Sequence, residues 1–89
     1  MAVFMVERRY VQQLEDITAV ADHINRVNGE EGVRWLSSFL SADKRKTFCL
    51  YESPDVESIR RAADRAGLPA DVIIELVGEV APDGSLSPL

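Results

Sequence analysis

The side chains best suited to bind a transition metal are few in this sequence. His23 and Cys49 are the single histidine and the single cysteine, whereas zinc and nickel sites usually combine several imidazole or thiolate ligands. His23 lies at the polar margin of an apolar helical stripe, which favours a surface position. Cys49 lies inside an apolar run, which favours a buried, inert thiol. Both are weak metal candidates, and the sequence leaves the metal unknown.

A carboxylate near aromatic rings is the second arrangement that could do chemistry. Glu7 ends an apolar run, and Trp35, Ser37 and Phe39 follow one another at two-residue spacing. Side chains two apart in a strand share a face, so these three are expected together, with Glu7 beside them if the strand register allows. Tyr51 joins them only if the preceding loop has an odd length. We predict a ligand-binding cleft formed by these five residues; the alternative is that the rings pack a core or dimer interface.

Motifs for catalysis are not recognisable. Ser37-Ser38 lies in a strand-like run and lacks the glycine-flanked turn that exposes a nucleophilic serine. No glycine-rich phosphate loop is present. The basic run Lys44-Arg45-Lys46 falls where a turn is expected, and a solvated turn is favoured over an anion site. Catalytic residues therefore stay unknown, and whether the protein is an enzyme stays open.

Composition excludes several classes of partner. The 89 residues carry a formal net charge of -5, which disfavours binding to nucleic acid or to anionic lipid. No apolar run approaches the roughly 20 residues that span a bilayer. The first residues have the wrong charge order for a signal peptide, and a lone cysteine fits a reducing compartment. We expect a cytoplasmic protein.

The elements that must position these residues follow from apolar periodicity. Strand-like runs cover 3–8, 33–40, 46–52 and 72–80. Apolar residues at helical spacing run from 14 to 27, with Asp16 or Thr18 as the expected cap and Asn28-Gly29 as the expected stop. A second helix is expected to have Ser53 as its cap and to end at Gly67.

This order of elements, βαββαβ, predicts an α+β, ferredoxin-like domain over 1–80 and a tail over 81–89. Both helices should cover one face of a four-stranded antiparallel sheet. The strands do not alternate cleanly between apolar and polar residues, as Phe4-Met5-Val6 and Val72-Ile73-Ile74 show. Both faces of the sheet therefore need cover. We predict a homodimer, in the manner of a dimeric α/β barrel, with a second sheet supplying the other cover.

Short stretches spread over most of the chain resemble a family of small bacterial proteins, a domain of unknown function with a nickel-binding member. The matching stretches are Phe4-Met5-Val6-Glu7-Arg8, Val33-Arg34-Trp35-Leu36, Ser38-Phe39-Leu40, Asp43-Lys44, Thr47-Phe48-Cys49-Leu50-Tyr51-Glu52, Pro54-Asp55, Ile59-Arg60 and Ala66-Gly67-Leu68-Pro69-Ala70-Asp71. The resemblance implies a ferredoxin-like fold, a homodimer and a capacity to bind nickel, while the cofactor itself stays unknown. Family members often have histidine where this sequence has Ser37 and Ala62, so we expect weak nickel binding.

Three functions are compatible with these observations. The first is a binding module, a dimer that holds a metal ion or small molecule at its sheet face or subunit seam. The second is an enzyme that uses the cavity between paired sheets to transform a small organic molecule, an analogy at the level of fold. The third is a structural or regulatory interaction domain without a ligand.

Overall fold

The computed structural model describes residues 1–89 and confirms the βαββαβ order of the first 76 residues. Two short strands follow that order at the C-terminal end. The elements are β1 (Ala2–Arg9), α1 (Thr18–Glu30), β2 (Arg34–Leu40), β3 (Lys46–Ser53), α2 (Val56–Ala66), β4 (Val72–Leu76), β5 (Gly78–Val80) and β6 (Leu86–Pro88).

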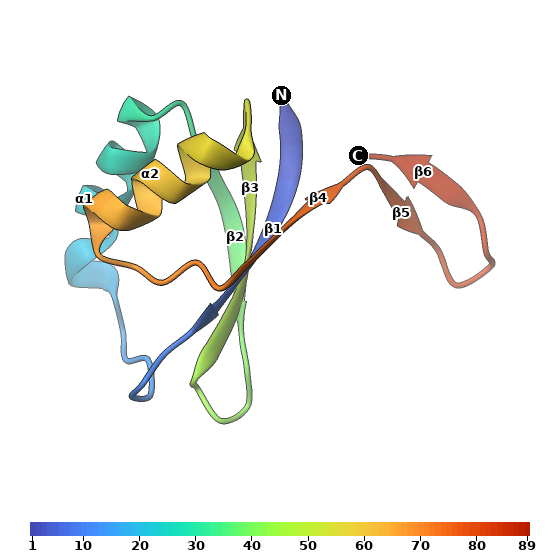
Figure 1. Cartoon of the computed structure of the whole chain (residues 1–89). Coiled ribbons are helices and arrows are strands. Elements are labelled where there is room, and N and C mark those ends of the chain that lie inside the picture. Colours follow the sequence, from blue (N-terminus) through green and yellow to red (C-terminus); the bar gives the residue numbers. More distant parts are fainter.

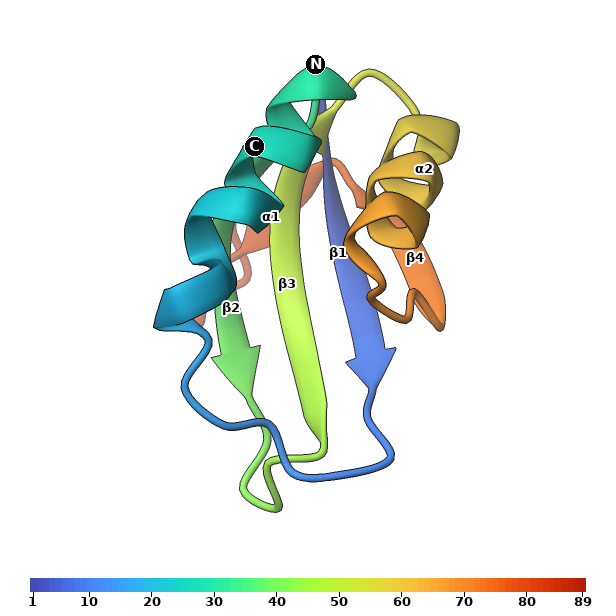
Figure 2. The same ribbon diagram turned by 90° about the vertical axis from the view of Figure 1, so that its left-hand side faces the viewer.

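Four strands form one antiparallel sheet in the order β2-β3-β1-β4. Both helices lie on the same face of this sheet, and the opposite face has no helical cover (Figures 1 and 2). This arrangement confirms the four-stranded sheet with two helices expected from the sequence. We call the two sides the helix face and the open face.

The core lies between the helix face and the helices. In β1 the side chains of Phe4, Val6 and Arg8 are buried there, and the residues between them are only half-buried on the open face. This alternation is the two-residue period of a strand. The buried apolar cluster consists of Phe4, Val6, Val27, Val33, Cys49, Tyr51, Ile59 and Ala62.

The helix boundaries differ from the expected ones. The N-cap of α1 is Ile17, without a side-chain hydrogen bond, so the expected cap at Asp16 or Thr18 was wrong. Asp16 Oδ1 accepts a hydrogen bond of 2.9 Å from the backbone N–H of Thr18 in the turn just before the helix. The helix continues through Asn28-Gly29 to Glu30, which makes the expected stop wrong. Asn28 is buried within the last turn, and Gly32, at φ 74°, supplies the left-handed residue that ends the helix.

The start of α2 also needs a correction. Asp55, not Ser53, is the N-cap, since its side chain accepts a 2.7 Å hydrogen bond from the backbone N–H of Ser58. Ser53 instead donates its hydroxyl hydrogen to the carbonyl oxygen of Asp55 at 2.7 Å, within the turn before the helix. Gly67 ends the helix at φ 70°, as expected.

The C-terminal part of the chain forms a two-stranded hairpin where the sequence predicted the end of a strand and a tail. The last strand of the sheet stops at Leu76 rather than continuing to Val80. Residues 78–80 pair instead with 86–88, and the turn at Asp83-Gly84 closes this hairpin. The hairpin, which we call the C-terminal arm, projects from the sheet on the side opposite the helices (Figure 1).

A β-bulge in β2 changes the faces on which its side chains lie. Trp35 pairs with Tyr51 and Ser37 pairs with Leu50, so the register shifts between these two pairs. The extra residue turns Trp35 toward the helix face, while Ser37 and Phe39 lie on the open face. The expectation that all three share one face was therefore wrong, because a bulge breaks the two-residue period. No helix is both long and apolar enough to span a bilayer.

Candidate functional site

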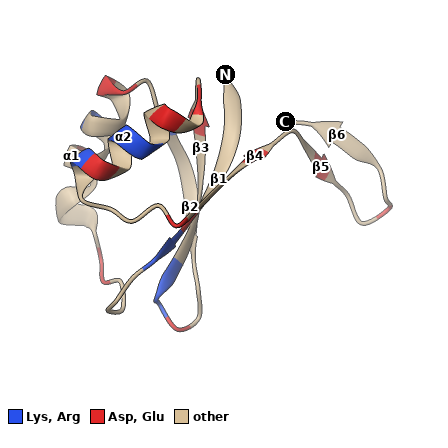
Figure 3. Cartoon of the chain, viewed as in Figure 1, with Lys and Arg blue, Asp and Glu red and all other residues tan.

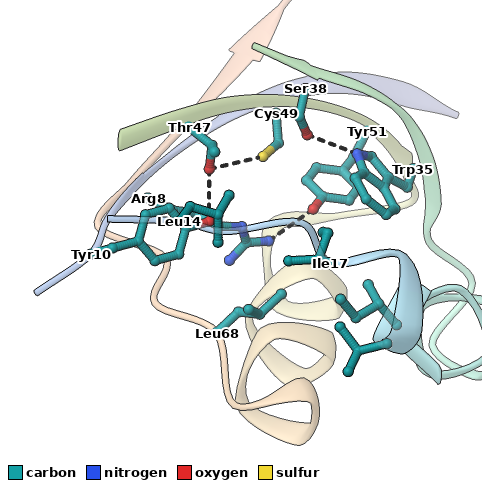
Figure 4. Close-up of a pocket in the computed structure, with 12 residues that line it drawn as sticks. Arg8, Tyr10, Leu14, Ile17, Trp35, Ser38, Thr47, Cys49, Tyr51 and Leu68 are labelled. Carbon is teal, nitrogen blue, oxygen red and sulfur yellow. Dashed lines mark hydrogen bonds between the residues drawn. The ribbon is translucent and has the colours of Figure 1, made fainter. Parts of the chain in front are cut away.

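A cavity of about 100 Å³ lies between the sheet and the N-terminal part of α1. β1, β2 and β3 line one side of it, and α1 with the loop before it lines the opposite side (Figure 4). Most of its wall is apolar or aromatic, and the polar groups come from β1, β2 and β3 and from Tyr10, which directly follows β1. The lining residues are Arg8, Tyr10, Leu14, Ile17, Val20, Ile24, Trp35, Ser38, Thr47, Cys49, Tyr51 and Leu68.

Arg8 places a positive charge at this cavity. Its side chain is only 3% exposed, because the alternation that buries Phe4 and Val6 also turns Arg8 inward. The guanidinium donates to the carbonyl oxygen of Pro69, and its Nη2 donates to Tyr51 Oη at 3.0 Å. Its Nε has no partner. No carboxylate forms an ion pair with Arg8, whereas buried charges are usually paired.

Tyr51 is the closest polar neighbour of this charge. Its ring centre lies 5.6 Å from the guanidinium carbon, within the range of a cation–π contact. Burial raises the pKa of Tyr51, and the positive charge of Arg8 offsets only part of that rise. The phenol is therefore neutral at pH 7, and it cannot supply the negative charge that Arg8 lacks.

A second hydrogen-bonded group lies beside the first. Thr47 Oγ1 lies 2.8 Å from the hydroxyl of Tyr10, and it accepts from the Cys49 thiol at 3.4 Å. Burial raises the pKa of Tyr10 as well. On the far wall, Trp35 Nε1 donates to Ser38 Oγ at 2.8 Å. These bonds fix the orientation of the side chains that line the cavity (Figure 4).

The five residues proposed as a ligand cleft divide between the two faces of the sheet. Trp35 and Tyr51 line the cavity, while Glu7, Ser37 and Phe39 lie on the open face. Glu7 sits opposite Phe48 in the register and forms a 2.6 Å ion pair with Arg9.

Sequence reasoning also missed members of the cavity. Arg8 and Tyr10 were not among the five residues predicted to bind ligand, although the alternation of β1 places Arg8 on the same face as Phe4 and Val6. Leu14 and Ile17 were assigned to a helical stripe. They lie before α1 and still line the same side of the cavity as α1.

The two metal candidates lie in different environments. His23 is exposed on α1, where its Nδ1 lies 3.4 Å from Arg26 Nη2. Cys49 is buried at the cavity. No group of three or more His, Cys, Asp or Glu side chains is arranged to hold a metal ion within one chain.

A small α+β domain with one helix-covered face and a cavity beneath the first helix is the class that this structure defines. The chain belongs to the SCO4226-like nickel responsive protein family, whose model matches residues 4–76. Among solved structures it is similar to SCO4226 from Streptomyces coelicolor A3(2), at 24% sequence identity and a TM-score of 0.67. That alignment covers 84% of this chain and 95% of the other. No curated protein matches.

Proposed function

We propose that this protein is a homodimeric binding protein whose small-molecule ligand occupies the cavity between α1 and the sheet. The observation that supports this most is the cavity itself, which combines apolar and aromatic walls with a few oriented polar groups. That combination is typical of small-molecule sites. Trp35 and Tyr51, two residues predicted to bind ligand, are part of it.

The open face supports the dimer. Apolar residues of all four strands lie there, including Phe39 at 60% and Ile74 at 52% exposure. Met5 lies between Leu50 and Ile74 in the register, so the apolar surface is continuous across the sheet. Large continuous patches of this kind usually mark an interface. A second copy of the chain would cover this face and complete the dimeric α/β barrel predicted from the sequence.

Charge distribution also favours a second copy. Beyond Arg65 the sequence contains no Lys or Arg, and its charged residues are Asp71, Glu75, Glu79 and Asp83. Positive charges are concentrated near the turn between β2 and β3, where Lys44, Arg45 and Lys46 follow one another. Figure 3 shows the C-terminal arm without basic residues. The arm of one chain and the turn of another are thus complementary in charge.

Only membership of the family suggests that this protein binds nickel. Within one chain, Ser37 lies on the open face and Ala62 is buried in α2, so neither position offers an imidazole. A nickel site would have to use His23, carboxylates or donors from two chains, and oxygen-rich sites bind nickel less strongly than imidazole sites. We expect weak nickel binding, which calorimetry on tag-free protein can measure.

Native mass spectrometry of untagged protein tests the assembly and ligand together. We expect a dimer that carries a retained small molecule, and Val20→Phe should release the molecule without dissociating the dimer. Val20 lies at the cavity and is 47% exposed, so a larger side chain there narrows the entrance at little cost to packing. Wild-type and variant proteins that both lack any bound molecule, even after incubation with a metabolite extract, would contradict the binding function.

Substitution on the open face tests the dimer separately. Phe39→Glu should shift sedimentation from dimer to monomer at tens of micromolar, because a charge would be buried at the interface. Val11→Glu is a suitable control, since Val11 is 92% exposed and lies outside the sheet. A wild-type protein that sediments as a monomer would overturn the dimer.

A further inference from the structure

Arg8 differs from the other arginines of this protein in its burial. The other seven are exposed to water. Four of them also pair with a glutamate, namely Arg9, Arg34, Arg61 and Arg65. Arg8 is buried, and its guanidinium has no acidic partner. A guanidinium stays protonated in proteins, so the fold contains a positive charge withdrawn from water without a counter-ion.

The guanidinium of Arg8 has hydrogen-bond donors that its present partners do not satisfy. Its two partners, the Pro69 carbonyl and the Tyr51 hydroxyl, are both neutral. Its Nε is buried and has no hydrogen-bond partner. Tyr51 Oη accepts from Arg8, which leaves the phenolic hydrogen free to donate. The cavity thus has a charged donor and a hydroxyl donor close together, and no buried acceptor satisfies them both.

The rest of the cavity determines which anion fits. Leu14, Ile17, Ile24 and Leu68 contribute hydrocarbon, and Trp35 contributes an aromatic wall. A strongly hydrated inorganic anion would lose its water against these groups without replacement. An organic monoanion has the negative charge that would neutralise Arg8. Its hydrocarbon part would also contact the apolar walls of the cavity.

Resting on the function proposed above, we infer that the ligand of this cavity is a small organic monocarboxylate, with Arg8 as its counter-ion. The carboxylate would accept from the Arg8 guanidinium and from Tyr51 Oη, and its hydrocarbon part would lie against Trp35 and the residues of α1. A cavity of about 150 Å³ accepts a ring the size of benzene. The cavity of about 100 Å³ therefore suits a short chain, whose end reaches the entrance near Val20.

Hexanoate and hexanamide provide a matched pair of probes, because they differ in charge and little in shape. Trp35 is the single tryptophan and lines the cavity, so its fluorescence reports binding directly. We expect hexanoate to bind at least about tenfold more tightly than hexanamide, since hydrogen bonds to charged groups are the stronger ones. Inorganic phosphate at the same ionic strength should not compete.

Arg8→Met tests the assignment, because methionine keeps much of the length and removes the charge. The variant should lose the preference for hexanoate and bind both probes equally. Arg9→Met is the control, since Arg9 is the neighbouring arginine on the exposed side of the same strand. Its preference should match that of the wild-type protein.

A measurement on the wild-type protein keeps the inference testable if Arg8→Met does not fold. In a titration of hexanoate labelled with ¹³C at the carboxyl carbon, the bound carboxyl group should ionise at a lower pH than the free acid, because Arg8 favours the charged form. Equal affinity for the two probes, or a bound carboxyl group that ionises at the same pH as the free acid or higher, would overturn the carboxylate. In that case binding of hexanamide would leave the binding function standing. Failure of both probes to bind would contradict the carboxylate assignment. Native mass spectrometry would then test the binding function by itself, because retention of another molecule would support that function and its absence would not.

Discussion

The two faces of the sheet differ in how far their apolar side chains are buried. The helix face is covered by α1 and α2, and its strand residues Phe4, Val6 and Tyr51 are at most 3% exposed. The open face carries side chains of similar polarity, but Phe39 and Ile74 remain more than half exposed. Polarity alone therefore does not determine burial in this chain. Burial depends on whether another element of the same chain lies opposite.

The covered face contains several polar groups, although buried surfaces are usually apolar. The covered face contains the buried charge of Arg8 and the hydroxyl groups of Tyr51 and Thr47, and the cavity lies among them. The uncovered face is apolar across its centre, where Met5 lies between Leu50 and Ile74. This difference is the basis for proposing ligand binding at the first face and self-association at the second.

The largest effect should come from the centre of the covered face. Ile59 is 1% exposed in α2 and belongs to the buried cluster. Ile59→Ala should lower the free energy of unfolding by about 2–5 kcal/mol, because the side chain leaves a cavity that the sheet cannot fill. Urea denaturation measures this loss. A loss below about 1 kcal/mol would mean that the core can repack around the missing atoms.

Two adjacent isoleucines of β4 compare the faces directly. Ile73 packs against the core, and Ile74 lies on the open face. At protein concentrations low enough to favour the monomer, Ile73→Ala should cost about 2 kcal/mol and Ile74→Ala less than about 1 kcal/mol. At high concentration the cost of Ile74→Ala should increase, because the proposed dimer would bury that side chain. An equal cost at all concentrations would argue against an interface on the open face.

Alkaline pH should weaken the covered face. Burial holds the pKa of Tyr51 above its ordinary value in the folded protein, so the unfolded chain loses this proton first. Stability should therefore fall as the pH rises above about 10, the pKa of an unperturbed tyrosine. Tyr51→Phe should flatten that decline in urea midpoints measured between pH 9 and 11. Tyr10→Phe is the comparison, and it should flatten the decline less because Tyr10 is more exposed.

The smallest effect concerns the surface, at the start of α2. The hydrogen bond from the Ser58 backbone lowers the pKa of Asp55 below its ordinary value. The stabilisation from the charged form is therefore complete above the unfolded pKa, near 4, and is lost as the pH falls through the lower folded value. Asp55→Asn keeps the cap and should remove this acid dependence, whereas Asp55→Ala should destabilise the helix at every pH. Thermal unfolding from pH 2 to 6 distinguishes the two variants.

Much of the fold follows from local patterns that the sequence displays. The apolar runs and the helical spacing determined the βαββαβ order, because strand and helix periods differ. Gly67 marked the end of α2, since only a residue without a Cβ adopts that backbone conformation readily. The apolar residues on both sides of β1 and β4 also indicated correctly that the open face would carry apolar side chains without cover from the helices.

The site depended on features that no local pattern revealed. The bulge between Trp35 and Ser37 is a property of the pairing of β2 with β3, and it moved Trp35 to the face opposite to Phe39. β4 ends at Leu76, before Val77, and the C-terminal arm is separate from it because residues 78–80 pair with residues 86–88. The charge of Arg8 was visible in the sequence. Its burial beside Tyr51 and its lack of an acidic partner were decided by the packing of the loop around Pro69 against β1 and β3, which joins residues far apart in the chain.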